Sequence, residues 1–459
     1  MSISDFQISK LKEPVHNGLT RSELWRRTQL KQIKRIIEEN EITILKALNE
    51  DLGKPETEAF FELIALHQEL NHAEKNLKNW MKPQKVQVPI SLQPSHAFIR
   101  PQPLGCVLII GPWNYPFSLV FQPLINALSA GNTAVLKPSE HAPSTSQLIK
   151  KLIEKYFSSK VVRVFEGDSA IAKSLLKEPF DHIFFTGGSQ IGKEIMKAAS
   201  NNLTPVTLEL GGKSPAIILR DTDIKVTARR LTWGKALNSG QTCIAPDHLL
   251  IQKDIYNSLL QEIKSSIKTF YGDNPSKSNN IAKIVNEHHF NRLRMLIEDA
   301  RENQEIVIGG EVNKEQRKIS PTFVRIKDIS SPLMDEEIFG PIMPIILIDS
   351  LEHGLKILRK NPHPLAIYLF GGTKSEQREL IETSISGGVC INDVVMQAGI
   401  SALPFGGVGT SGMGKYHGLE GFNTFSHRKS ILKRSFWPDI KFRYPPYKLN
   451  ISYLKGLLR

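Results

Sequence analysis

The chain lacks the features that would place it among disulfide-rich, membrane-spanning or secreted proteins. It has only three cysteines in 459 residues, Cys106, Cys243 and Cys390. An odd number at wide spacing fits neither a disulfide framework nor a cluster of metal ligands. No stretch approaches the roughly eighteen apolar residues that a spanning helix needs, and the first residues lack the basic and apolar regions of a signal peptide. We therefore expect no metal, a reducing compartment and a cytoplasmic location.

Internal repeats and low-complexity tracts are also absent from the chain. Hydrophobic residues make up 40% of the total and charged residues 23%, which is the composition of a soluble globular protein. A chain of 459 residues is too long for one ordinary core. We therefore expect two or three domains.

Acidic residues are scarce in the C-terminal segment. The whole chain carries 59 Lys and Arg against 46 Asp and Glu, a net charge of +13, and residues 428–459 hold nine Lys or Arg against Asp439 alone. Aromatic residues interleave with these charges, so peripheral contact with an anionic membrane surface, such as its inner face, is one interpretation. A solvated or subunit-packed tail is favoured, because Pro438, Pro445 and Pro446 prevent a long amphipathic helix. No recognition motif accompanies the charge, so we expect no nucleic acid.

The spacing of apolar residues predicts a helical opening layer followed by two α/β regions. Helical spacing runs from 22 to 80, and near-alternation over 84–103 suggests an extended hairpin. From 106 to 210, and again from about 213 to 400, short apolar runs alternate with helical stretches, which is typical of parallel sheets covered by helices in nucleotide-binding folds. The expected strands are 106–110, 133–136, 161–165, 182–185 and 206–210 in the first region, and 214–219, 248–251, 344–348, 366–370 and 388–393 in the second.

One thiol lies in a setting that suits a nucleophile. Cys243 stands in Asn238-Ser-Gly-Gln-Thr-Cys243-Ile-Ala-Pro246, where its neighbours are mostly small or polar. Such neighbours favour an exposed loop, because an inert core cysteine is usually surrounded by large aliphatic residues. This segment alone leaves open the alternative of a buried spare thiol.

Two glycine patterns were compared with the dinucleotide fingerprint. Residues 407–412 have its spacing, but Pro404 precedes them and too little chain follows for a βαβ unit, so we interpret this match as fortuitous. The turn of residues 185–193 follows an apolar run and opens a helical stretch, and it contains Gly187, Gly188, Ser189 and Gly192. Glycines there would let a diphosphate approach free backbone N–H groups. A tight packing turn would use the same glycines.

Three further segments place polar side chains after predicted strands. Lys137 and Glu140 lie at the carboxyl end of the first sheet and could hold a ribose, or the loop could cap the next helix. Asn114, fixed between two prolines, could donate to an oxyanion or form a local Asx turn. Glu209, flanked by leucines, could be a general base with a raised pKa or the partner of Lys213.

Together these segments resemble the aldehyde dehydrogenase superfamily. The motifs in chain order are 111–116, 137–140, 185–192, 209–213, 240–246, Glu336-Glu-Ile-Phe-Gly-Pro341 and Pro404-Phe-Gly-Gly407. Residues 240–247 and 411–418 resemble the class 3 branch, which includes dehydrogenases of fatty, aromatic and some carotenoid-derived aldehydes. The resemblance covers roughly residues 20 to 450, and it implies an α/β fold with a Rossmann-type cofactor domain, an α/β catalytic domain and an oligomerisation hairpin.

The resemblance also implies roles for single residues. Cys243 would be the nucleophile, Glu209 the general base, and Asn114 the oxyanion donor together with the backbone N–H of Cys243. Glu337 would contact the nicotinamide ribose. The remaining assignments are the adenosine-ribose contacts Lys137 and Glu140, Phe339 beside the nicotinamide, and an apolar substrate funnel of Tyr115, Leu119, Trp233 and Leu237, each of which could instead be plain core.

One departure from the family pattern concerns the cofactor. Family members often have Ser at the position of Gly188, so a side-chain hydrogen bond to the diphosphate is missing in this chain. NAD is preferred over NADP in our interpretation, because Glu140 would accept a hydrogen bond from a ribose 2′-hydroxyl and repel a 2′-phosphate.

The implied reaction is the NAD(P)-dependent oxidation of an apolar aldehyde, medium-chain, long-chain or aromatic, through a thiohemiacetal and a thioester that water hydrolyses. A CoA-acylating dehydrogenase and a cysteine-dependent thioesterase or hydrolase are the alternatives. The resemblance further implies a homodimer joined by the hairpin and a strand near residues 423–432. The expected division is 1–83 and 104–210 for the NAD(P)-binding domain, 84–103 and 421–433 for the oligomerisation element, 211–420 for the catalytic domain, and 434–459 for the basic tail.

Overall fold

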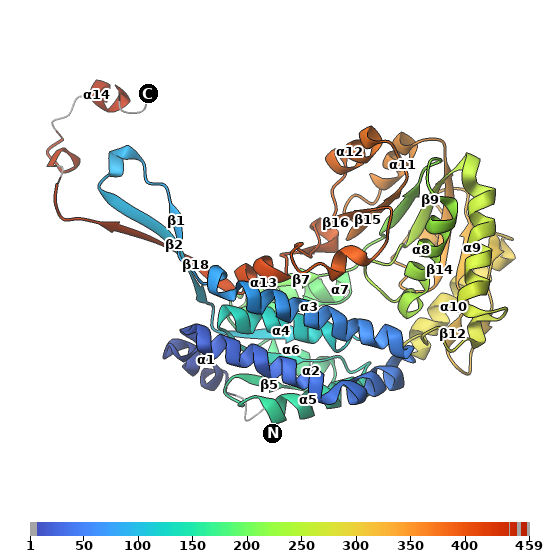
Figure 1. Ribbon diagram of the computed structural model, residues 1–459, viewed down its shortest axis with the longest axis horizontal. Coiled ribbons are helices and arrows are strands. Elements are labelled where there is room, and N and C mark those ends of the chain that lie inside the picture. Colours follow the sequence, from blue (N-terminus) through green and yellow to red (C-terminus); the bar gives the residue numbers. More distant parts are fainter. Residues whose placement is uncertain (1–6, 440, 448–450, 457–459) are drawn as a thin grey trace.

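The computed structural model describes residues 7–439, 441–447 and 451–456. Residues 1–6 of the expected first domain, and residues 440, 448–450 and 457–459 of the expected tail, lie outside the described residues. Figure 1 shows two α/β lobes and a narrow sheet that projects from them. Within the described ranges, no helix has both the length and the apolar character that a membrane crossing requires.

The first lobe is built on a six-stranded sheet with the order β17-β7-β6-β3-β4-β5. All neighbours are parallel except β17, which runs antiparallel to β7. After β3 the chain adds β4 and β5 on one side and then β6 and β7 on the other, so the strand order reverses between β3 and β6. Ligands of open α/β sheets bind at such a reversal, at the carboxyl ends of the strands. The strands are β3 (Cys106–Ile110), β4 (Thr133–Lys137), β5 (Val162–Val164), β6 (His182–Thr186), β7 (Val206–Glu209) and β17 (Gly412–Met413).

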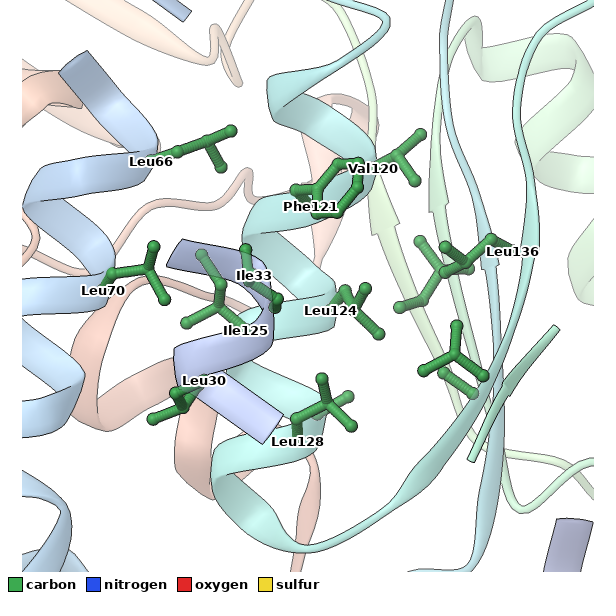
Figure 2. Close-up of a cluster of buried hydrophobic side chains, with 14 of the residues drawn as sticks. Leu30, Ile33, Leu66, Leu70, Val120, Phe121, Leu124, Ile125, Leu128 and Leu136 are labelled. Atoms are coloured by element: carbon green, nitrogen blue, oxygen red, sulfur yellow. The ribbon is translucent and has the colours of Figure 1, made fainter. Parts of the chain in front are cut away.

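Helices cover both faces of this sheet, which explains why its central strands read as continuous apolar runs. Figure 2 shows how the layers interlock: Leu30 and Ile33 of α2, Leu66 and Leu70 of α3, and residues of α4 pack together, and Leu124 of α4 points toward Leu136 of the sheet. The helices of this lobe are α1 (Ser9–His16), α2 (Glu23–Leu52), α3 (Glu56–Trp80), α4 (Ser118–Ala130), α5 (Pro143–Tyr156), α6 (Ser169–Leu175), α7 (Ser189–Ser200) and α13 (Gly418–Thr424).

The second lobe contains a seven-stranded sheet with the order β10-β13-β14-β9-β8-β15-β16, parallel except for β10. Residues 210–214 alone separate β7 from β8, so the carboxyl end of β7 lies beside the start of the second sheet. The strands are β8 (Pro215–Ile218), β9 (His248–Gln252), β10 (Ile306–Ile308), β13 (Thr322–Arg325), β14 (Ile342–Ile348), β15 (Ala366–Phe370) and β16 (Gly388–Ile391). The helices are α8 (Ile224–Ala236), α9 (Tyr256–Tyr271), α10 (Glu287–Glu302), α11 (Leu351–Leu358) and α12 (Lys374–Thr383), and a small hairpin pairs β11 (Val312–Asn313) with β12 (Lys318–Ile319).

The projecting sheet has three antiparallel strands in the order β1-β2-β18. They are β1 (Gln84–Val86), β2 (Ser95–Pro103) and β18 (Ser426–Arg434), and the short helix α14 (Ile451–Gly456) lies beyond them in the tail (Figure 1). The predicted hairpin over 84–103 is therefore confirmed. The strand expected over 421–433 starts later, because residues 418–424 form α13, which packs against α3 and α4.

The ten strands expected in the two α/β regions are all present, with ends shifted by at most two residues. Sequence patterns missed β10, β11, β12, β13 and β17, which are short. The pairing of β17 with Glu209 and Leu208 of β7 also returns residues 412–413 to the first sheet, although we assigned residues 211–420 to a catalytic domain. The rejected glycine match at 407–412 lies in a loop that leads into β17, away from any strand-to-helix turn.

Replacing Leu124 by alanine should destabilise the first lobe by ~2–5 kcal/mol, because the side chain is completely buried and its loss leaves a cavity. Urea unfolding followed by circular dichroism measures this change. Leu24→Ala is the matched control, since Leu24 also lies in a helix but is 76% exposed. Equal effects of the two substitutions would contradict the packing described for α4.

Candidate active site

A cavity of about 860 Å³ lies where the two large sheets meet. Its walls come from the carboxyl ends of β3, β6 and β7 and from the segments that lead into β8, β9, β14 and β15. This is the position that the strand reversal between β3 and β6 predicts. The predicted site residues in its wall are Asn114, Tyr115, Leu119, Gly187, Gly188, Glu209, Trp233, Leu237, Cys243, Glu337 and Phe339.

Four predicted residues lie outside the cavity wall. Lys137 ends β4, and its Nζ donates to Glu140 Oε2 at 2.7 Å and to the Pro138 carbonyl at 3.1 Å. Ser189 and Gly192 lie in α7, which begins directly after the glycine turn. The capping alternative for Glu140 is wrong, because Asp51 of α2 accepts hydrogen bonds from the first N–H groups of α5 instead.

The expected exposed loop around Cys243 is wrong, because residues 238–242 and 244–246 are buried. Cys243 itself is partly buried and lines the cavity, so the core does not enclose it as it would an inert thiol. The chain reaches it through a turn in which Asn238, Ser239 and Gly240 all have positive φ, at 50°, 53° and 71°. A Cβ on Gly240 would lie 2.3 Å from the Gly340 carbonyl oxygen, so only glycine fits where these two loops cross. Burial, together with the negative charges of Glu337 and Glu209, raises the pKa of the Cys243 thiol to about 12.

Asn114 follows β3 and is held against the nucleophile loop. Its Nδ2 donates to the Gln241 carbonyl at 3.0 Å, and Asn238 Nδ2 donates to the Asn114 carbonyl at 2.9 Å. The Asx-turn alternative is therefore wrong, because the side chain reaches across 127 residues of sequence. An amide nitrogen has two N–H groups, and one of them is engaged with Gln241.

Glu209 is the last residue of β7 and is 3% exposed. Neither of its carboxylate oxygens has a hydrogen-bond partner among the described residues. Burial raises the pKa of this carboxyl well above its usual value. The alternative of a pair with Lys213 is wrong, since Lys213 Nζ lies 2.5 Å from Asp247 Oδ1. A buried carboxyl with a raised pKa that faces a cavity suits a general base.

Glu337 lies beside Gly211, in the segment 210–214 that joins the two sheets. A Cβ on Gly211 would come within 1.8 Å of Glu337 Oε2, so glycine is required there for the carboxylate to approach the backbone. Burial and the charge of Asp247 raise the pKa of Glu337 to about 8, and the N–H of Gly212 opposes this shift. Glu337 and Glu209 both act on the Cys243 thiol, and the pKa of each carboxyl is raised above its ordinary value.

A buried network fixes the loop that carries Glu337. Lys213 Nζ donates to the carbonyls of Leu333 and Glu336 at 2.9 and 2.8 Å. Asp247 Oδ2 accepts from the Ile338 N–H at 2.9 Å. The positive charge of Lys213 overcomes the effect of burial and holds the pKa of Asp247 below its ordinary value.

The glycine turn closes one end of the cavity. Gly188 is the N-cap residue of α7 with φ −72° and ψ 149°, and no side chain caps this helix. The first N–H groups of α7 therefore remain available to an anion. A Cβ on Gly188 would meet no atom within 4 Å, so this position has room for the diphosphate of a dinucleotide.

Sequence analysis missed several residues of the cavity wall. They include Phe61, Ile64, Gln68, Trp113, Thr186, His289, Arg292, Met396, Tyr416 and His417. Trp113 packs edge-on against Phe339, with ring centroids 5.3 Å apart. The sequence of α3 could have indicated its place beside the cavity. Glu62 and Glu69 interrupt its apolar face at helical spacing, and carboxylates are rarely buried unless they are paired.

Among the described residues, no group of three or more His, Cys, Asp or Glu is arranged to hold a metal. The cavity thus contains a thiol, two carboxyls and a carboxamide, with an anion-binding helix terminus at one end. The three cysteines of the chain are all free. These groups suit covalent catalysis on a carbonyl compound with a dinucleotide alongside.

Comparison with known proteins supports this chemistry. Residues 19–431 match the family described as the aldehyde dehydrogenase family. A dimeric NADP-preferring aldehyde dehydrogenase of Rattus norvegicus is 43% identical over 97% of this chain and 98% of its own length. The 4,4′-diaponeurosporen-aldehyde dehydrogenase of Staphylococcus aureus is 42% identical over 95% of both chains. A structure described as the substrate-bound state of Staphylococcus aureus AldH superposes with a TM-score of 0.95, 40% identity and full coverage of both chains.

Replacing Glu209 by glutamine should stabilise the folded protein at neutral and alkaline pH. The folded state holds the Glu209 proton more tightly than the unfolded chain, because its pKa is raised from 4.5. The cost of burying the carboxylate is therefore absent at low pH and grows as the pH rises from the unfolded pKa toward the folded one. We expect Glu209→Gln to gain ~1–3 kcal/mol at pH 8 in urea unfolding, and less toward pH 5.

Glu194→Gln is the control for this change, since Glu194 lies exposed on α7. Its effect should stay within about 0.5 kcal/mol. A Glu209→Gln protein that is less stable than the wild type at pH 8, or equally stabilised at every pH, would contradict the unpaired state of this carboxyl.

Proposed function

Because the chain belongs to the aldehyde dehydrogenase family, we propose that it oxidises an apolar aldehyde to the carboxylic acid with NAD as the preferred cofactor, NADP being the alternative. The family match confirms the resemblance drawn from the sequence motifs, including the class 3 branch, and with it the α/β fold class. The observation that carries the proposal is that Cys243, Glu209 and Asn114 all line the same cavity.

The first half of the reaction needs a thiolate at Cys243. Its raised pKa keeps the thiol protonated in the cavity, so a nearby base has to take the proton. Glu209 and Glu337 both have raised pKa values and are suited to this. The thiolate then adds to the aldehyde carbon. The second N–H of Asn114 Nδ2 and the backbone N–H of Cys243 stabilise the oxyanion, because the negative charge develops on that oxygen as the bond forms.

The second half releases the acid. NAD(P), when bound, would supply the two-electron acceptor for the adduct on Cys243, which would then be a thioester. Glu209, whose two oxygens have no hydrogen-bond partner in the described part of the chain, takes a proton from water as the water attacks the thioester carbonyl. The carboxylic acid leaves and the thiol is restored. The sum is aldehyde, water and NAD⁺ giving acid, NADH and a proton.

The residues around the glycine turn fit a dinucleotide. The uncapped start of α7 would bind the diphosphate through backbone N–H groups, so the missing Ser at position 188 leaves these donors in place. Lys137 ends β4, which β3 separates from β6 in the sheet, and Glu140 follows three residues later. Both residues would contact the adenosine ribose. The negative charge of Glu140 supports NAD over NADP, because it would repel a 2′-phosphate.

The other end of the cavity supports an apolar substrate. Tyr115, Leu119, Trp233 and Leu237 lie in its wall as expected for the funnel. At its edge Ile64 and Met396 are 37% and 54% exposed. An apolar rim that leads to a partly buried thiol favours medium-chain, long-chain or aromatic aldehydes, since each buried methylene adds about 0.8 kcal/mol. The S. aureus relative is named for a carotenoid-derived aldehyde, which is also apolar.

We also propose a homodimer joined through the three-stranded sheet. The sheet projects from the lobes (Figure 1) and exposes Val86, Ile90 and Leu432. Exposed apolar residues on a narrow sheet are typical of a subunit interface. The rat relative is named as dimeric. Phe436 and Trp437, which follow β18 and are almost fully exposed, would pack on the second subunit. We also propose a cytoplasmic location for the dimer.

Aldehyde oxidation is tested by the formation of NADH or NADPH with hexanal, a long-chain aldehyde and an aromatic aldehyde. Cys243→Ala should lower kcat/KM by more than about 1000-fold, because no other group replaces the nucleophile. Cys390 is a second partly buried thiol and lies outside the cavity, so Cys390→Ala should oxidise aldehydes at the wild-type rate. The longer aldehyde should have the higher kcat/KM.

Equal turnover of short and long aldehydes would contradict the apolar funnel. Activity that requires coenzyme A would favour the acylating alternative. Hydrolysis of a thioester without any nicotinamide cofactor, combined with no aldehyde oxidation, would favour a thioesterase.

The dimer is tested by analytical ultracentrifugation of the full chain and of a variant that ends at Arg434. We expect a dimer for the full chain and a weaker one for the variant, because the tail adds contact area. Flotation with anionic and neutral vesicles tests the other interpretation of the tail. Binding of only the full chain to anionic vesicles, with an unchanged dimer in the variant, would favour the membrane surface over subunit packing.

A further inference from the structure

The turn before the nucleophile is strained. Asn238 and Ser239 both adopt left-handed backbone conformations, which cost roughly 1 kcal/mol or more each for residues other than glycine. Such a turn persists only where its surroundings hold it. Ser239 Oγ donates to the Ala282 carbonyl at 2.5 Å, and Gln241 Nε2 donates to the Asn238 and Lys283 carbonyls at 3.0 and 3.1 Å.

The backbone N–H at the start of this turn is bound by a distant carboxylate. Glu58, in the first turn of α3, accepts a hydrogen bond from the Asn238 N–H through Oε2 at 2.9 Å. The two residues are 180 positions apart in the chain. Glu58 thus connects the helical layer of the first lobe to the loop that carries Cys243.

The Asn238 side chain extends this connection to the oxyanion donor. Its Nδ2 donates both to the Asn114 carbonyl and to the Gln241 carbonyl, and the second of these also accepts from Asn114 Nδ2. Displacement of Asn238 would therefore move both the Asn114 peptide and the peptide two residues before Cys243.

A second carboxylate of α3 acts beside Glu58. Glu62, one helical turn later, pairs with Lys54 at 2.6 Å and accepts from the N–H groups of Phe117 and Ser118 just after the Asn114 loop. Lys54 Nζ lies 4.0 Å above the Tyr115 ring, whose hydroxyl lies 2.8 Å from Thr242 Oγ1. The start of α3 therefore contacts both loops of the catalytic centre.

The charged and titratable groups around Glu58 come from three elements. Lys54 precedes α3, Tyr115 lies in the loop after β3, and Tyr271 ends α9; the pKa of each tyrosine is raised chiefly by burial and further by Glu58. Burial raises the pKa of Glu58 itself to about 7, although the Asn238 N–H and Lys54 oppose the shift. Glu58 is a half-buried carboxyl that also holds a strained turn, so it is retained at a cost in stability, which indicates a functional purpose.

We propose that Glu58 is a positioning residue that holds Cys243 and Asn114 in a fixed relative position by anchoring the left-handed turn at 238–240. This role rests on the proposed aldehyde oxidation. Glu58 does not line the cavity and touches neither reacting atom, so it acts through the Asn238 peptide.

The test compares Glu58→Ala, Glu58→Gln and Glu56→Ala with the wild type. Glu58→Ala loses the acceptor and should lower kcat by at least about 10-fold, with the KM for NAD changed less than about 2-fold, since small misplacements of reacting groups are costly. Glu58→Gln keeps a carbonyl oxygen for the Asn238 N–H and should retain at least about a third of the wild-type kcat. Glu56 shares the same helical turn but is exposed, so Glu56→Ala should leave kcat unchanged.

Coupling to Asn114 separates positioning from a general loss of stability. If Glu58 acts through this centre, Glu58→Ala should reduce kcat less than about 3-fold in an Asn114→Ala background, because the geometry that it protects is already lost. The same 10-fold loss in both backgrounds would indicate a merely structural role and overturn the proposal. Poor activity of Glu58→Gln, or full activity of Glu58→Ala, would overturn it as well.

Alkylation of Cys243 by iodoacetamide gives a readout without aldehyde or cofactor. Release of the turn should expose the thiol and lower its pKa, so alkylation in Glu58→Ala should be at least about 3-fold faster while turnover is slower. Glu58→Gln and Glu56→Ala should react at the wild-type rate. If the wild type oxidises no aldehyde, the proposed function fails, and this measurement still decides the role of Glu58; an unchanged alkylation rate would overturn it.

Discussion

The buried ion pair between Lys213 and Asp247 is the interaction on which the catalytic centre depends. Lys213 lies in the short joint between the two sheets, and Asp247 ends the nucleophile loop. Through Leu333, Glu336 and Ile338 the same pair holds the loop that carries Glu337. Buried charges are costly unless their remaining donors and acceptors are satisfied. Here they are satisfied by backbone groups of the segment that they organise.

Because Lys213 pairs with Asp247, it does not pair with Glu209. Among the residues that the structure describes, none donates a hydrogen bond to the Glu209 carboxyl at the end of β7, and burial raises the pKa of this carboxyl. Pairing with Lys213 would stabilise the folded protein but would hold the carboxylate in its charged form and weaken it as a base. The arrangement of charges therefore favours chemistry over stability at this position.

Several of these features follow from short stretches of sequence. Apolar runs such as 106–110 and 366–370 predicted strands correctly, because a strand buried on both faces has a local signature. The glycine turn at 187–188 was placed correctly between a strand and a helix for the same reason. The small, polar neighbours of Cys243 wrongly favoured an exposed loop, because tertiary contacts bury that loop. The strands β10, β11, β12, β13 and β17 were missed because two to four residues carry little pattern.

The sequence by itself determined ten strands of the two large sheets, the family and the candidate residues Cys243, Glu209 and Asn114, since each is marked by short stretches of neighbouring residues. Only the tertiary structure decided which charges pair and what holds the nucleophile. Lys213 pairs with Asp247, 34 residues later in the chain, and not with Glu209, which is only four residues away. Glu58 accepts a hydrogen bond from Asn238, which is 180 residues away. Such contacts depend on how two sheets and a helix meet in space, and no local pattern in the chain encodes that distance.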